Sequence, residues 1–138
     1  MDADRGGRGR RAVAAAQASL TLIDAARAAR ALAGIERFDP VGAMRPEGVE
    51  ALCQAGECFE LSGQVHAVFV VRLVDGIAFV DAAQGSGDAD VTEVLDAILT
   101  RQAQGLRAIA LQTMRPGLVR KLQRRGYRVA GWILKKDM

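Results

Sequence analysis

Apolar residues recur at every second position in some segments and at every third or fourth in others, which predicts strands interleaved with helices. Leu20 and Leu22 alternate with polar residues and predict a first strand. Asp24 is a good N-cap for an alanine-rich helix over residues 25–33, which Gly34 ends. A turn segment then leads to the next helix.

A second helix is predicted over residues 45–56, with Pro46 in its first turn and Gly56 at its end. Strands follow over residues 58–61, 65–73 and 76–83. The last two are joined by Asp75-Gly76, a strong signal for a two-residue hairpin turn. That turn would pair Val74 with Ile77 and Arg72 with Phe79, and would place one set of residues on a common face: His66, Val68, Val70, Arg72, Phe79, Asp81 and Ala83.

The second half of the chain continues the alternation of elements. Asp90 and Glu93 form a capping-box pattern before a predicted helix over residues 91–104. A strand over 106–113, a helix from Pro116 to the residue before Gly126, and a closing strand over 127–136 complete the order. The fold class is therefore α/β (α+β), with a central mixed, mostly antiparallel sheet flanked by helices.

Charge divides the chain into an arm and a domain. Residues 1–17 are predicted to be a flexible basic arm that becomes ordered only in an assembly, and residues 18–138 a single domain. No apolar run is long enough to span a membrane and no signal peptide begins the chain, so we expect a cytoplasmic protein with no membrane partner. The arginines of the arm are Arg5, Arg8, Arg10 and Arg11.

The sequence contains two cysteines, Cys53 and Cys58, and one histidine. This set is too small for a convincing zinc site, so no metal is expected and the cysteines are interpreted as small core side chains.

The segment after the strand predicted over residues 76–83 has a pattern typical of phosphate binding. Gln84-Gly85-Ser86-Gly87-Asp88-Ala89 fits Gln/Arg-x-x-Gly-x-Gly/Ala, and Gly126-Tyr127 makes a Gly-aromatic step into the last predicted strand. With its element order, the chain resembles the GNAT superfamily of acyl-CoA-dependent N-acetyltransferases over about residues 18–138. The resemblance implies that the glycines and the following helix N-terminus would bind the pyrophosphate of acetyl-CoA.

Other residues depart from the family pattern. Asp88 and Asp90 place negative charge where a phosphate would lie, and Leu122 stands where many GNAT enzymes have a tyrosine acid. Asp81 is the best candidate for a catalytic base, with His66 on the same predicted face. Each has a structural alternative: Asp81 would pair with Arg72, and His66 would be a half-buried strand residue. Tyr127 is expected to pack against the edge of the core, and Leu122 to pack inside it.

Three functions stay open from the sequence. The first is a non-catalytic binding or assembly module with a degraded active site and no cofactor, whose partners are other protein subunits; a weak resemblance to GNAT-like proteins of tailed-phage structural gene clusters suggests a virion component. The second is an active acetyltransferase that uses acetyl-CoA and works by positioning. The third is nucleic-acid binding through the arm and a basic C-terminal helix, whose residues are Arg120, Lys121, Arg124 and Arg125.

Overall fold

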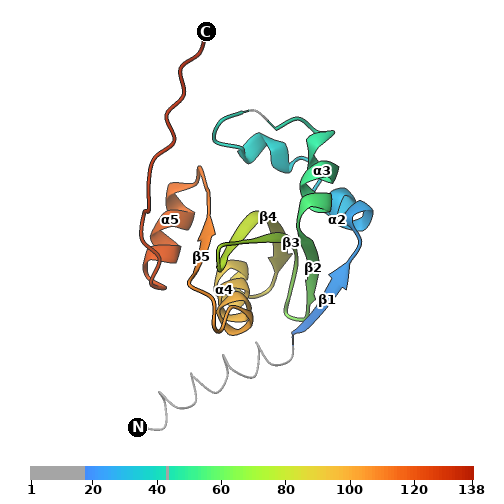
Figure 1. Cartoon of the computed structure of the whole chain (residues 1–138). Helices are drawn as coiled ribbons and strands as arrows, with labels where there is room; N and C mark the ends of the chain where they lie inside the picture. The colour runs from blue at the N-terminus through green and yellow to red at the C-terminus, as the bar shows by residue number, and fades with distance from the viewer. Residues whose placement is uncertain (1–17, 43) are drawn as a thin grey trace.

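The structure is a computed structural model, and it describes residues 18–42 and 44–138. Five strands form one sheet in the order β1-β2-β3-β4-β5 (Figure 1). Adjacent strands are antiparallel except for β4 and β5, which are parallel and joined by a helix. The strands are β1 (Ser19–Ile23), β2 (Glu57–Ser62), β3 (Val65–Val74), β4 (Ile77–Gly87) and β5 (Ala108–Leu111).

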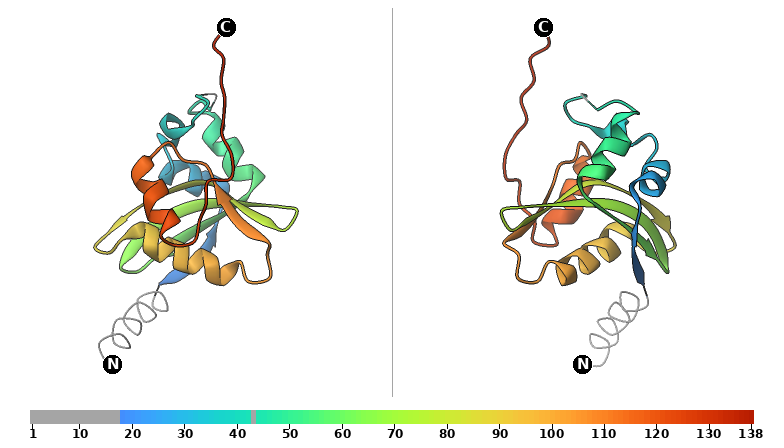
Figure 2. Two further views of the ribbon diagram at one scale, coloured as in Figure 1. Left: turned by 90° about the vertical axis from the view of Figure 1, so that its left-hand side faces the viewer. Right: turned by 45° about the vertical axis from the view of Figure 1, so that its right-hand side comes forward.

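Helices cover both faces of this sheet (Figure 2). One face carries α2 (Ala25–Ala31) and α3 (Gly48–Ala55), which are linked through the short 3₁₀ helix η1 (Ile35–Phe38). The other face carries α4 (Val91–Gln102), and α5 (Pro116–Gln123) contacts α4. The predicted fold class, a mixed and mostly antiparallel sheet flanked by helices, is confirmed.

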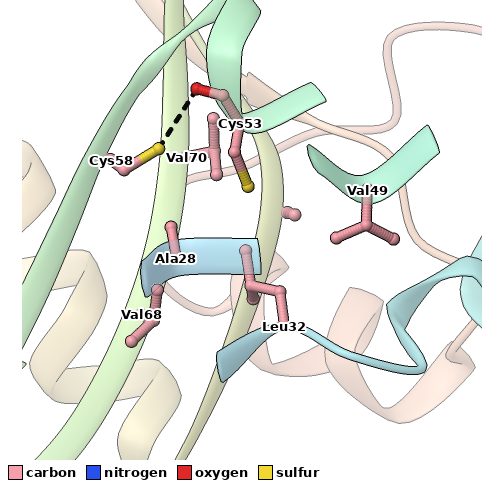
Figure 3. Close-up of a cluster of buried hydrophobic side chains, with 8 residues drawn as sticks. Ala28, Leu32, Val49, Cys53, Cys58, Val68 and Val70 are labelled. Carbon is pink, nitrogen blue, oxygen red and sulfur yellow. Dashed lines mark hydrogen bonds between the residues drawn. The ribbon is translucent and has the colours of Figure 1, made fainter. Parts of the chain in front are cut away.

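The first core lies between the sheet and the pair α2 and α3 (Figure 3). Leu32 and Val70 are fully buried there. Cys53 and Cys58 are also buried, and the Cys58 Sγ–H donates a hydrogen bond of 3.2 Å to the carbonyl oxygen of Cys53. The interpretation of both cysteines as core side chains is confirmed.

The second core lies under α4. Phe69 of β3 is 2% exposed and stacks on Phe59 of β2 with ring centroids 5.4 Å apart. Ile98 and Leu99 of α4 close this core from the helix side. Strand β3 therefore contributes side chains to both cores, as a strand buried on two faces must.

Two local predictions are confirmed in detail. The Asp24 carboxylate accepts a hydrogen bond of 2.7 Å from the backbone N–H of Arg27 and caps α2. Asp75 and Gly76 have φ values of +52° and +75°, which the hairpin turn requires, and Val74 pairs with Ile77.

The predicted closing strand over residues 127–136 is wrong. Residues 127–138 form no helix or strand, and this segment extends away from the domain (Figure 1). A strand forms only where another strand satisfies its backbone hydrogen bonds, and none lies beside this segment among the described residues. The sequence pattern of this segment favoured a strand but contained no information about a partner.

Candidate functional site

The candidate site begins at an irregularity in β4. Val80 pairs with Val71 of β3, but the next pair joins Ala82 to Val70, so Asp81 is an extra residue in β4. Such a β-bulge reverses which residues face each side of the sheet. The predicted common face is therefore wrong beyond the bulge: Ala83 pairs with Phe69, while Ala82 joins the core under α2 and α3.

The bulge is also the point where β4 loses its neighbour β5. The parallel pairing covers only Ile77–Val80 of β4, opposite Ala108–Leu111. From Asp81 to Gly87, β4 continues without a strand on that side among the described residues. Backbone groups along this edge are consequently available to a ligand.

The predicted phosphate-binding segment lies mostly within the strand. Gln84 to Gly87 form the end of β4 and pair with β3, and only Asp88 and Ala89 lie in the connection to α4. The two glycines have a packing reason. A Cβ on Gly85 would lie 2.7 Å from the carbonyl oxygen of His66, and a Cβ on Gly87 would lie 2.6 Å from that of Gln64. Both glycines thus allow β3 and β4 to approach closely.

The N-terminus of α4 already contains a carboxylate. Asp90 Oδ1 accepts a hydrogen bond of 3.2 Å from the backbone N–H of Glu93, and Lys121 Nζ donates to Asp90 Oδ2 at 3.2 Å. The first of these bonds, aided by the second, lowers the pKa of Asp90. An internal anion therefore caps α4, and a lysine from α5 neutralises part of its charge.

The candidate catalytic residues Asp81 and His66 have separate partners. Arg72 Nε lies 2.5 Å from Asp81 Oδ2, and its Nη2 lies 3.2 Å from Oδ1, which is the pairing expected from the sequence. His66 Nε2 lies 2.9 Å from Glu60 Oε2 and is about half exposed. The hydrogen bond from His66 lowers the pKa of Glu60. No contact joins Asp81 to His66.

A buried cluster on α4 fixes the end of α5, and sequence reasoning missed it. Asp96 is 8% exposed and accepts hydrogen bonds from Arg125 Nε at 2.5 Å and from Tyr127 Oη at 2.7 Å. Burial and this bond raise the pKa of Tyr127 well above its ordinary value. Asp96 stands beside the apolar positions Leu95 and Ile98 in the sequence, and that neighbourhood was the available signal for a buried acid.

Leu122, Gly126 and Tyr127, the positions at which the family pattern was compared, have structural roles at the end of α5. Leu122 is 8% exposed, so the prediction that it packs in the core is confirmed. Its carbonyl oxygen accepts a hydrogen bond of 3.1 Å from the backbone N–H of Tyr127, and Gly126 has a φ of +95° between them. This arrangement is a Schellman C-cap.

The basic residues divide into two groups. Lys121 and Arg125 are paired with acids of the α4 segment, whereas Arg120 and Arg124 are exposed. Among residues 18–42 and 44–138, no three His, Cys, Asp or Glu side chains gather to hold a metal ion, and no helix is both long and apolar enough to cross a membrane. The four arginines predicted to bind partners from the arm lie outside the described residues: Arg5, Arg8, Arg10 and Arg11.

Comparison with solved structures identifies the architecture. A ribosomal-protein-alanine N-acetyltransferase from Brucella melitensis biovar Abortus 2308 matches with a TM-score of 0.51 and 15% identity, over 88% of this chain and 98% of that one. A probable acetyltransferase matches with a TM-score of 0.50 and 9% identity, over 87% of this chain and 96% of that one. The chain has the GNAT fold.

No family model and no curated protein matches the sequence. At these identities the likeness concerns the GNAT fold alone, and fold does not determine activity. The function must therefore be argued from the residues of the site.

Proposed function

We propose that this chain is a non-catalytic binding and assembly module built on the GNAT fold. The observation that carries the proposal is the Asp90 carboxylate at the N-terminus of α4, held there by the backbone N–H of Glu93 and by Lys121. In a cofactor-binding protein of this fold, that helix end would receive a pyrophosphate. Here a side chain of the protein uses it.

The charges at this end do not fit a pyrophosphate. Asp88 and Asp90 are both exposed, and each would repel a phosphate about 5 Å away by roughly 1–3 kcal/mol. Lys121 is the cation placed to compensate, but binding a phosphate would take it away from Asp90. An exposed pair of this kind contributes about 1 kcal/mol or less, so the lysine can move, whereas Asp90 stays as the cap.

The groups that would transfer protons do not fit acetyl transfer either. Leu122 is an apolar core residue, and the Tyr127 hydroxyl is bonded to Asp96, with a pKa shift that opposes its ionisation. Asp81 is paired with Arg72, and the single histidine of the sequence, His66, contacts Glu60 instead. A role as a virion component stays a prediction from the sequence resemblance.

Titration of the full chain with acetyl-CoA in a calorimeter tests the proposal. We expect no saturable binding in the micromolar range, and a Kd of about 10 μM or tighter would contradict it. The double variant Asp88→Asn/Asp90→Asn removes both charges, while asparagine still caps the helix. Binding gained by this variant would identify the carboxylates as the obstacle. Asp137→Asn, a charge change in the C-terminal segment, is the matched control.

A second candidate, an acetyltransferase that acts by positioning, is favoured by one observation. The edge of β4 from Asp81 to Gly87 lies beside no other strand in the described part of the chain. Its backbone N–H groups would orient an acyl group, and orientation alone contributes substantially to rate. Transfer of a labelled acetyl group from acetyl-CoA to a peptide amine, absent when the protein is omitted, would support this candidate over the first.

A further inference from the structure

The C-terminal tail, residues 128–138, pairs with no strand in the described part of the chain. It contains no helix or strand, and every view shows it leaving the body of the domain (Figures 1 and 2). Its start is fixed: Tyr127, the residue before it, is held by Asp96 and by the carbonyl oxygen of Leu122. The base of the tail is therefore held by bonded groups, and the tail runs back alongside α5 before it extends away from the domain (Figure 1).

The composition of the tail is that of a buried strand. Trp132 is 87% exposed and Leu134 is 93% exposed, and both lie on the same side of an extended chain. Val129 and Ile133 lie on the opposite side and are 50% and 45% exposed. β-Branched and aromatic residues on both sides are typical of a strand that another protein surface covers.

The sheet offers a matching edge. Strand β5 is the last strand of the sheet and pairs only with β4, so its other edge carries backbone groups without a strand partner in the described region. None of its four residues, Ala108–Leu111, is a lysine or a proline, the residues that commonly protect an edge strand from further pairing. The edge is open to strand addition.

We propose that two copies of this chain exchange their tails, with each tail adding as a sixth strand beside β5 of the other copy. Each chain supplies one tail and one β5 edge, and a twofold axis satisfies both at once. Strand β1 is the other edge strand of the sheet, and the lysine variant described below tests which edge the tail uses. The outer part of the tail extends away from β5 of its own chain (Figure 1), which favours the edge of a second copy. The apolar side chains around Trp132 would then be covered by the partner.

This inference rests on the proposed assembly role, and it identifies the partner as a second copy of the chain. The tail exchange is tested by measuring the molecular mass in solution, whereas the proposed function is tested by titration with acetyl-CoA. A chain that binds acetyl-CoA could still exchange tails, and a chain that does neither would contradict only the tail exchange. The two results are therefore separable.

The experiment is a measurement of mass by light scattering and of dissociation by sedimentation, on the full chain over a range of concentrations. We expect the mass of two chains. The variant Trp132→Ser/Leu134→Ser should weaken dimerisation by about 30-fold or more, since exposed aromatic anchors dominate such interfaces. Lys135→Ser/Lys136→Ser in the same tail is the matched control and should leave the dissociation constant within about threefold.

A mixing experiment tests the exchange itself. A chain that ends at Ala130 lacks the apolar tail but keeps the edge, and Ala108→Lys/Ala110→Lys keeps the tail but places lysines on the edge strand. Each should be monomeric alone, and the two together should form a heterodimer. Thermal melting of each checks that it folds, and amide exchange at residues 132–134 should slow on mixing.

Three outcomes would overturn the proposal. A full chain that is monomeric at every concentration excludes exchange between copies, whether or not its tail amides are protected. A dimer that persists after removal of residues 131–138 places the interface elsewhere. Folded single variants that fail to form a heterodimer on mixing show that the tail does not recognise β5.

Discussion

At the scale of single residues, Asp96 has the greatest effect on how the last part of the domain is held. It is a buried acid with two partners from the segment that follows α5, Arg125 and Tyr127, and with Thr100 Oγ1 of its own helix at 3.4 Å. An acid of this kind stabilises a structure only while its partners are present, because burial removes it from water. The position of α5 against α4 depends on it.

Replacing Asp96 with alanine should lower the free energy of unfolding by about 2–4 kcal/mol, because Arg125 and Tyr127 lose a charged acceptor. Urea denaturation at pH 7 measures this change. Glu93→Ala on the same helix is the comparison, since the Glu93 side chain is 38% exposed and its loss should cost about 0.5 kcal/mol. Equal losses for both variants would show that Asp96 contributes no more than a surface acid.

The two cysteines should resist alkylation in the folded protein. Burial, followed by the proximity of Cys58, raises the pKa of Cys53 to about 11. At pH 7 only about one Cys53 side chain in ten thousand would be the reactive thiolate. Iodoacetamide labelling followed by mass spectrometry should show no modification in buffer and two adducts in urea. Rapid labelling of the native chain would mean that the core around α3 opens readily.

At the scale of elements, signals that act over a few residues were sufficient to predict caps and turns. Asp24 caps its helix, Asp75-Gly76 forms the hairpin turn, and Pro116 is in the first turn of α5, all as expected. These features depend on the local backbone, which the sequence states directly. Features that depend on a distant neighbour were not predictable in the same way.

Gly85 and the closing strand illustrate the second case. A glycine-rich stretch is typical of a loop, but here Gly85 lies in β4 because a side chain would collide with β3 and with Val91 of α4. The segment after Gly126 has a strand-like sequence without a neighbouring strand. In the candidate site, the pairing of Asp81 with Arg72 was predicted, whereas the links from Lys121 to Asp90 and from Arg125 to Asp96 needed the packing of α5.

The cap of α4 should make stability depend on pH. The pKa of Asp90 is lowered in the folded chain, so its contribution is present above the ordinary pKa of about 4 and is lost as pH falls through the folded value. Asp90→Ala should cost about 0.5–2 kcal/mol at pH 7, and Asp90→Asn less. Urea denaturation at pH 7, 5 and 3 measures this. A difference between wild type and Asp90→Asn that grows at pH 3 would contradict the assignment.

At the scale of the whole molecule, stability should decrease from the middle of the sheet toward β5. Strand β3 has a strand on each side and a core on each face, whereas β5 has four residues and one neighbour. Native-state amide exchange should therefore be slowest in β3, with opening energies near the global value, and fastest in β5. Slow exchange throughout β5 in a monomer would contradict this order.

The extra residue in β4, Asp81, divides the strand into two segments whose side chains alternate in opposite order. Before Asp81, the odd-numbered Phe79 faces the same side as Arg72; after it, the even-numbered Ala82 does so. Removing Asp81 would join two segments that already alternate correctly, so the cores on both sides would keep their residues. Removing a residue of β4 away from the bulge would shift the residues between that point and the bulge and turn apolar side chains outward. In the evolution or the design of this strand, Asp81 is thus the position where a length change preserves both cores, although the chain would lose the point at which β4 and β5 part.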